Sequence, residues 1–223
     1  MRCGSVLAAA GIALCALAGC TTDQGYLPIV ATRAVDLDLH GLDFAHIPVK
    51  RDVEGSDTRA TSFLLIPTQD PPRLERAVER ALASTGGDVL TRVHVYSRQW
   101  WLLFVSLETI IVRGNSVDIP DVDVGAPGAR ISAISTENAP QIGFRVKGAP
   151  RVSGVVGEAS AQTFFWVPTS TTSPTLQEAV EQTLARGNGD LITDAQIDRW
   201  WWYVPFFYGS EGWRVRGDVL RTR

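Results

Sequence analysis

Three histidines are the only imidazoles of the chain, and their spacing decides whether they could support acid–base or metal chemistry. His40 and His46 lie six residues apart in a stretch expected to be extended, so both would point to one face, with Asp38 nearby. That spacing fits neither the helical HExxH pair nor a zinc finger. His94 is expected on the polar face of a strand. A hydrolase built on His40 and His46 is the weakest of three functional hypotheses.

Two acidic and two basic residues recur at matching places. Asp88 and Asp190 each follow a glycine, and we expect each carboxylate to accept hydrogen bonds from backbone N–H groups of a turn. Arg113 and Arg216 each precede a glycine, where a cross-strand ion pair is expected and anion binding is the alternative. No GxSxG, GxGxxG or phosphate-binding glycine loop is present. We therefore predict no catalytic residue, metal or cofactor, and no enzyme.

Cysteine chemistry is concentrated at the start of the chain. Leu17-Ala18-Gly19-Cys20 closes an apolar stretch that begins at Val6, and Arg2 precedes it. A basic start, an apolar core and small residues are the three parts of a secretory signal. The core is shorter than the ~20 apolar residues that span a bilayer. Cys3 and Cys15 lie inside this leader, so the rest of the chain would contain no disulfide.

The leader resembles the lipobox of bacterial lipoproteins. That resemblance implies cleavage before Cys20, acylation of its thiol and new amino group, palmitate among the acyl chains, and a stable membrane anchor, which a single chain does not provide. Thr21 replaces the Asp that retains enterobacterial lipoproteins in the inner membrane, which implies the outer membrane, facing the periplasm. The expected divisions are a signal peptide at 1–19, a lipidated tether at 20–28, module 1 at 29–123, a linker at 124–130 and module 2 at 131–223.

The charge balance excludes one class of partner. The chain has 21 basic and 24 acidic side chains, a formal net charge of −3, and no run of five basic residues. Such a protein is a poor nucleic-acid binder and gains no electrostatic attraction to anionic lipid. We expect no nucleic-acid partner.

The chain beyond the leader contains an internal repeat. Four blocks recur in the same order at an offset of 101 to 103 residues, which indicates two copies of one module. The blocks are 61–68 with 162–169, 74–83 with 176–185, 87–91 with 189–193, and 112–114 with 215–217.

Each copy predicts a strand, a helix and two further strands. The helix is expected to have a polar N-cap, proline at its first position and a glycine-containing end. The first strand is expected to end at Pro67 in the first copy and at Pro168 in the second. The helix markers are Asp70, Pro71 and Gly86-Gly87 in the first copy, and Ser173, Pro174 and Asn188-Gly189 in the second. We therefore predict an α+β fold of two tandem β-α-β-β modules, with an antiparallel sheet and one helix per module. It resembles the small α+β modules of envelope lipoproteins.

Two aromatic runs, residues 100–105 and 200–209, lie where hairpin turns are expected, although turns are normally polar. One interpretation buries them against the helix and the sister module. The other exposes them as a contact surface for a protein partner or the bilayer interface. The candidate contact residues are Trp100, Trp101, Trp201, Trp202, Tyr203, Phe206 and Phe207.

The favoured hypothesis is a periplasm-facing, lipid-anchored structural or adaptor protein that contacts another envelope component through these hairpins. A second hypothesis is a binding module for a hydrophobic or aromatic ligand, held in a groove between the modules. Trp166, Trp202 and Trp213 would line that groove.

Overall fold

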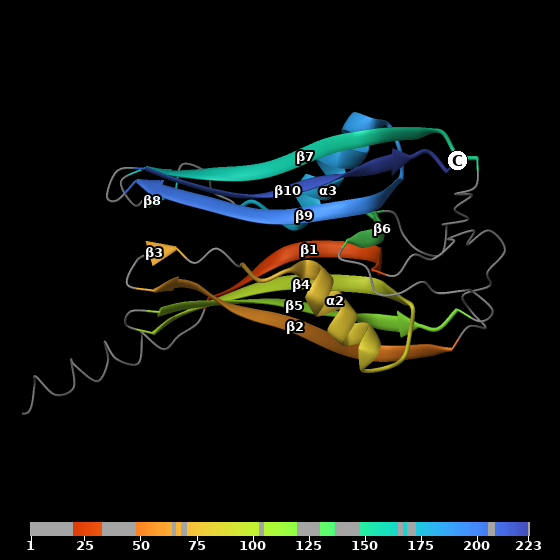
Figure 1. Ribbon diagram of the computed structural model, residues 1–223, viewed down its shortest axis with the longest axis horizontal. Coiled ribbons are helices and arrows are strands. Elements are labelled where there is room, and N and C mark those ends of the chain that lie inside the picture. The colour runs from red at the N-terminus through yellow and green to blue at the C-terminus, as the bar shows by residue number, and fades with distance from the viewer. Residues whose placement is uncertain are drawn as a thin grey trace, which may run out of the picture.

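Most of the chain that the computed structural model describes is β-strand (Figure 1). The described residues are 20–32, 48–63, 66–67, 71–102, 105–119, 130–136, 148–164, 167–168, 173–204 and 208–222. The strands are β1 (Cys20–Ala31), β2 (Val49–Phe63), β3 (Ile66–Pro67), β4 (Val89–Leu102), β5 (Val105–Val117), β6 (Ile131–Ser135), β7 (Arg151–Phe164), β8 (Val167–Pro168), β9 (Leu191–Val204) and β10 (Tyr208–Leu220). The helices are α2 (Leu74–Ala83) and α3 (Leu176–Gly187).

The predicted α+β class is wrong. Eight strands of five residues or more and two of two residues form one antiparallel sheet, and the two described helices have only ten and twelve residues. Residues 20–28, expected to form a tether, are part of β1 and pair with β4. Of the expected linker at 124–130, only Arg130 lies within the described residues.

The strand order repeats about the centre of the sheet. It runs β3-β2-β5-β4-β1-β6-β9-β10-β7-β8, so the first five strands form one half-sheet and the last five form another with the same internal order. Backbone irregularities repeat as well. Positive φ angles occur at Asp52 and Gly154, and at Arg92 and Asp194, and the members of each pair are 102 residues apart. The two halves therefore match in detail as well as in element order.

The two half-sheets lie over each other as two layers (Figure 1). They are joined through β1 and β6, which pair over only three residues, Ile29 to Ala31. Trp213 of β10 nevertheless bonds to Gln24 of β1, and Arg199 of β9 contacts Glu108 of β5. The sheet therefore folds back on itself, and the inner faces of the half-sheets meet.

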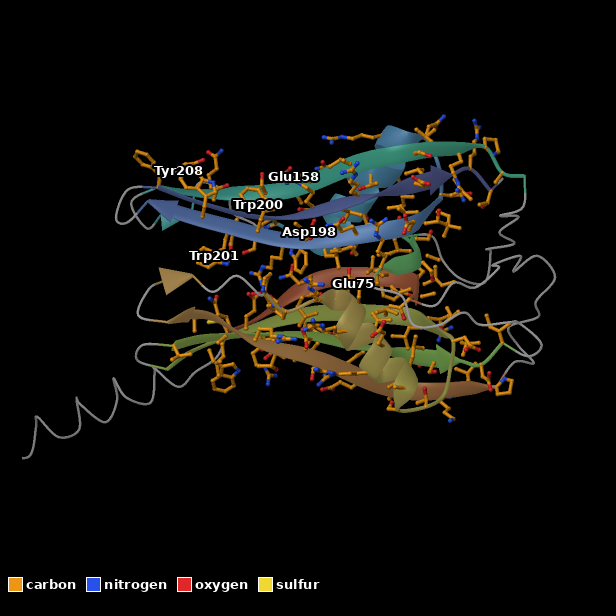
Figure 2. The ribbon with its side chains drawn as sticks, in the orientation of Figure 1. Glu75, Glu158, Asp198, Trp200, Trp201 and Tyr208 are labelled. Carbon is orange, nitrogen blue, oxygen red and sulfur yellow. The ribbon has the colours of Figure 1, made fainter. Side chains whose placement is uncertain are left out.

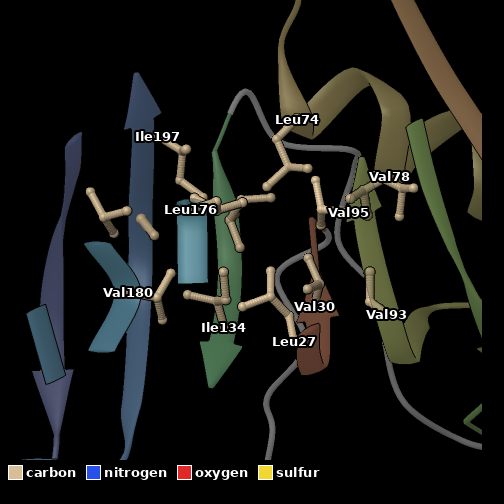
Figure 3. Packing of buried hydrophobic residues seen from close by; sticks show 14 of the residues in the cluster. Leu27, Val30, Leu74, Val78, Val93, Val95, Ile134, Leu176, Val180 and Ile197 are labelled. Atoms are coloured by element: carbon tan, nitrogen blue, oxygen red, sulfur yellow. The ribbon is translucent and has the colours of Figure 1, made fainter. Parts of the chain in front are cut away.

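One core serves both halves. Side chains from α2, α3 and both half-sheets form a single buried cluster, in which Leu74 and Leu176 lie near Ile134 and Ile197 (Figure 3). The helices pack closely because glycine stands beneath each of them. A Cβ at Gly55 would lie 2.1 Å from the carbonyl oxygen of Ala77, and one at Gly157 would lie 2.4 Å from that of Ala179.

The predicted helix ends are confirmed only in part. The predicted N-caps are wrong, because the caps are Arg73 and Thr175 and the prolines precede the helices. Thr175 forms a capping box with Glu178, and this reciprocal pair fixes the start of α3. The C-terminal prediction is confirmed, because Gly86 follows α2 with φ 74° and Asn188 caps α3 with φ 49°.

Candidate functional site: the aromatic end of the sheet

Four hairpins reverse direction at one end of the molecule, on the left in Figure 1. The residues that pair across the last rung of each hairpin are Phe63 with Ile66, Leu102 with Val105, Phe164 with Val167, and Val204 with Tyr208. An ion pair near these rungs joins the two layers. Arg199, five residues before the end of β9, pairs with Glu108, three residues after the start of β5. We call this region, from the level of Gln99 outward, the aromatic end.

Four aromatic side chains lie on the outer face of the second half-sheet at this end. The ladders place Tyr208 opposite Phe164 and Val204, and Ser210 opposite Trp202. Phe164 is 51% exposed and Trp202 is 46% exposed, and the rings of Trp202 and Tyr208 are 5.0 Å apart. Trp200 and Tyr208 are half-buried (Figure 2). Phe164, Trp200, Trp202 and Tyr208 together form what we call the outer patch.

The predicted contact residues divide between the two faces. Trp202 belongs to the outer patch, and Trp100, on the corresponding face of β4, is half-buried. Trp201 is half-buried on the inner face, opposite Glu211, and points between the layers (Figure 2). Trp101 and Tyr203 lie in β4 and β9. Their side chains, together with Phe206 and Phe207, lie outside the described residues.

Of the outer patch, only Trp202 is among the predicted contact residues. Trp200 and Tyr208 lie in the predicted aromatic run 200–209 but were not singled out, and Phe164 lies outside both runs. Phe164 belongs to the repeated block 162–169, whose sequence predicts only a strand that leads into a helix. The structure ends β7 at Phe164 and reverses the chain into β8, so the residue lies on the same end as Tyr208. A β-rich block that ends in consecutive aromatic residues before a proline was the available signal.

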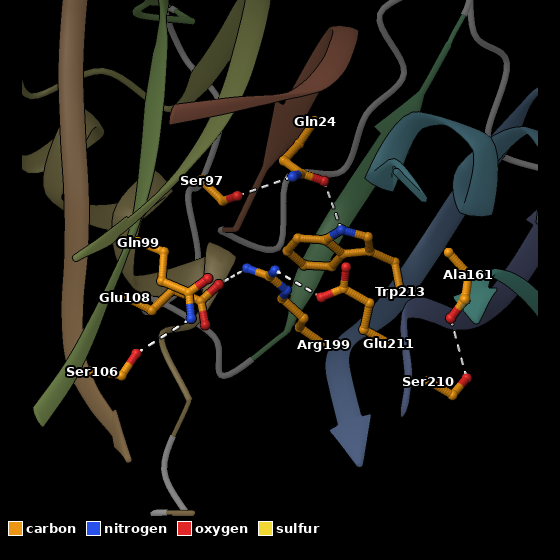
Figure 4. Close-up of polar contacts among 10 residues, drawn as sticks. All are labelled: Gln24, Ser97, Gln99, Ser106, Glu108, Ala161, Arg199, Ser210, Glu211 and Trp213. Carbon is orange, nitrogen blue, oxygen red and sulfur yellow. Dashed lines mark hydrogen bonds and ion pairs between the residues drawn. The ribbon is translucent and has the colours of Figure 1, made fainter. Parts of the chain in front are cut away.

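Gln24 joins the two layers near this end (Figure 4). Its amide Nε2 donates to Ser97 Oγ of β4 at 3.0 Å, and its Oε1 accepts from Trp213 Nε1 of β10 at 2.7 Å. Gln24 and Trp213 are both buried. Both polar groups of the amide are thus satisfied without water, as burial requires.

Arg199 makes a second and more strongly charged link. Its guanidinium pairs with Glu108 of β5 and lies 3.8 Å from a carboxylate oxygen of Glu211 on β10 (Figure 4). It also lies over the Trp213 ring, 5.5 Å from the centroid. Glu108 and Glu211 are 103 residues apart, so one arginine holds the matching glutamates of both halves. The side chains of Arg199 and Glu108 are 17% and 5% exposed.

A small cavity lies beside these links. It has a volume of about 90 Å³ and is lined by residues of both layers, among them Cys20, Gln99, Arg199 and Trp213. Pockets for drug-sized ligands typically enclose ~300–1,000 Å³. Trp213 is buried and hydrogen-bonded, and Trp202 lies on the outer face, so these two do not line a common groove. Trp166 lies outside the described residues.

Cys20 is the first described residue and the first residue of β1. It lies opposite Gln99 in the β1–β4 ladder, and its side chain is exposed. Its sulfur is therefore accessible to chemistry at the aromatic end. Within the described residues, no helix has the length and apolar character needed to cross a bilayer.

The helices also link the halves, through matching residues. Gln177 of α3 accepts a hydrogen bond from the backbone N–H of Tyr26 in β1 at 2.9 Å. Glu75 of α2, 102 residues earlier, accepts one from the backbone N–H of Ile197 in β9. Glu75 is buried, and burial raises the pKa of its carboxyl above the ordinary value of 4.5. The same bridge therefore carries a titratable acid in one half and a neutral amide in the other.

Three of the four recurring charged residues, Asp88, Asp190 and Arg113, have structural partners. Asp88 accepts from the backbone N–H of Ile119, and Asp190 from that of Thr222, so both carboxylates bind backbone N–H groups as predicted. These donors are not in the turn beside each aspartate, where they were predicted, but lie 31 and 32 residues further along the chain. Arg113 forms the predicted cross-strand ion pair with Glu54, at 2.7 Å.

The histidines offer no metal cluster where they are described. His94 is exposed and lies beside the rings of Tyr26 and Tyr96, whereas His40 and His46 lie outside the described residues. Among the described residues, no group of three His, Cys, Asp or Glu side chains is placed to hold a metal ion.

No protein-family model, curated protein or solved structure matches this chain.

Proposed function

We propose that this chain is a lipid-anchored protein of the bacterial cell envelope that serves as a structural or adaptor subunit, with its aromatic end as the contact surface. Cys20 carries the proposal, because it directly follows the Leu17-Ala18-Gly19 signal and its exposed sulfur begins the folded body. Acylation there would fix the body to a membrane, and Thr21 favours the periplasmic face of the outer membrane.

A structural role is supported by the way the halves are joined. Gln24, Arg199, Glu75 and Gln177 each link elements of both halves, and the described cavity between the layers is small. Residues that serve mainly to join two halves suit a rigid body that presents a surface. The outer patch is the most exposed aromatic surface described, and large aromatic side chains are typical of contact sites.

The anchor can be tested by intact mass and membrane fractionation of the full chain expressed in a Gram-negative bacterium. The wild-type protein should lose residues 1–19, gain the mass of acyl chains and fractionate with the membrane. Cys20→Ser should keep its leader and gain no acyl mass. Cys15→Ser, inside the leader, is the matched control and should behave as wild type. An unmodified wild-type protein in the membrane-free fraction would refute the anchor.

A further inference from the structure

The hairpins of the aromatic end are free of charge over long stretches of sequence. No Asp, Glu, Lys, Arg or His occurs in residues 60–69, 99–107, 159–177 or 200–210, and each of these windows contains one of the four hairpins. The residues that join the paired strands are also apolar in sequence: Leu64-Leu65, Leu103-Phe104, Phe165-Trp166 and Pro205-Phe206-Phe207. A water-facing end would be expected to carry charges.

The opposite ends of the same strands are charged. Lys50, Arg51 and Asp52 lie near the start of β2, and Arg151 begins β7. Asp218 lies near the end of β10, where it pairs with Arg151 at 3.7 Å. The sheet is therefore polarised along its strands, with a charged end and an uncharged aromatic end.

The level of Cys20 coincides with the boundary between these two regions. The ladders place Cys20 opposite Gln99, and Gln99 opposite Glu108, the first charged residue after the β4–β5 hairpin. Arg98 lies one rung further in and donates from Nε to Thr21 Oγ1 at 3.1 Å. An anchor at Cys20 would thus enter the membrane at the depth where the charged surface ends.

The distance from Cys20 to the ends of the strands determines how deep in the bilayer the hairpins would lie. Cys20 is the first residue of β1 and pairs with Gln99 of β4, so no tether would separate the body from its acyl chains. From Gln99 to the end of β4 at Leu102 the strand extends about 10 Å further, at ~3.3 Å per residue. Apolar surfaces of interfacial proteins enter the headgroup and acyl boundary by about 5–10 Å. The hairpins have the length and composition to reach that depth.

We propose that the aromatic end is a membrane-inserting surface, which dips into the interfacial region of the bilayer that holds the acyl chains of Cys20. This inference rests on the proposed function and names the envelope component that the aromatic end contacts. Trp and Tyr prefer this interfacial depth because an apolar ring and a polar N–H or O–H are both accommodated there. In the outer patch, Trp202 and Tyr208 supply such groups, whereas the Nε1 of Trp200 is buried and Phe164 is purely apolar.

The test uses two probe sites on one strand. Phe164 and Val152 are apolar, both 51% exposed and at opposite ends of β7, so Phe164→Cys and Val152→Cys form a matched pair. The acylated full chain carrying either cysteine is labelled with the environment-sensitive dye NBD. It is then reconstituted in vesicles of phosphatidylethanolamine and phosphatidylglycerol, with or without brominated lipid. Trp202→Cys gives a second probe of the outer patch, should Phe164→Cys fold poorly.

We expect severalfold brighter NBD emission at 164 than at 152, and quenching by brominated lipid at 164 only. Equal, water-like emission at both sites in acylated protein would overturn the inference while leaving the anchor intact. The inference would also be overturned, with the anchor intact, if a photo-crosslinker at 164 captured a protein in cells while the dye at 164 gave water-like emission. If mass analysis shows no acyl chain, the anchor fails. The inference, which places the aromatic end in the bilayer that holds those chains, would then fail together with the anchor, whereas water-like emission at 164 in acylated protein overturns the inference alone.

Discussion

Replacing Arg199 with methionine should test whether the halves are held together by a buried charge. Methionine keeps much of the side-chain length but removes the guanidinium that pairs with Glu108. The side chain of Glu108 is 5% exposed, so its carboxylate would be left in the interior without its cation. Removing one partner of a buried ion pair typically costs about 3–5 kcal/mol. Glu211, with its side chain 37% exposed and 3.8 Å away, should contribute little to that loss.

Arg214→Met is the matched control. Arg214 also pairs with a glutamate, Glu158 at 3.1 Å, but on the outer face, where the side chains are 49% and 31% exposed. Exposed pairs of this kind contribute about 0.2–1 kcal/mol. Urea unfolding followed by tryptophan fluorescence would give both free energies of unfolding.

A third variant separates charge from packing. Adding Glu108→Leu to Arg199→Met removes the orphaned carboxylate, and replacing a buried pair by apolar residues of similar size is often close to neutral. The double variant should therefore recover most of the lost free energy of unfolding. If Arg199→Met costs no more than Arg214→Met, or if the double variant is less stable than the single one, the assignment of this link as a buried structural ion pair is wrong.

Two further predictions concern stability. Glu75→Gln copies the Gln177 bridge into the first half. Because burial raises the pKa of Glu75, the wild type should lose stability as pH rises from 4.5 through that raised value, and the variant should lack this loss in urea titrations across the same rise in pH. Gln177→Glu should add a similar loss, and identical pH profiles for all three proteins would refute the account. Gly55→Ala should lower the thermal midpoint by the equivalent of about 1–3 kcal/mol, because the new methyl meets the Ala77 carbonyl. Gly154→Ala, with φ 67° and open space, should cost about 1–2 kcal/mol through backbone strain alone, and a larger loss there than at Gly55 would contradict the packing argument.

Local features could be predicted from the sequence because their causes are local. The glycine and asparagine that end the helices lie within a few residues of the structure they determine. The role of Asp88 and Asp190 as acceptors of backbone N–H groups was also predictable, but their donors, Ile119 and Thr222, are more than 30 residues away and were not. The Arg113–Glu54 pair followed from its place on a strand. Such residues need no knowledge of the rest of the fold.

The fold class was missed because the outer strands carry little apolar alternation. Gly55 and Gly157 stand where β2 and β7 meet the helices, so the inward positions that would show Val or Ile carry glycine. Lys50, Arg51 and Asp52 are three consecutive charged residues, so the start of β2 also shows no apolar alternation. The links between the layers were beyond prediction for a different reason. Gln24 and Trp213 are 189 residues apart, and only the folded sheet brings them together.

The fold-back of the sheet is what gives the molecule a single aromatic end. β1 runs antiparallel to β4 and to β6, and β6 runs antiparallel to β9, so β4 and β9 run in opposite directions along the ladder order. In a flat sheet, the hairpins that follow β4 and β9 would therefore lie at opposite ends, and only one could be near Cys20. The three-residue junction at β1 and β6 allows the halves to close over each other, and Gln24 and Arg199 bond them in that closed state. The contacts that stabilise the interior are thus the same contacts that gather the uncharged hairpins of both halves around Cys20.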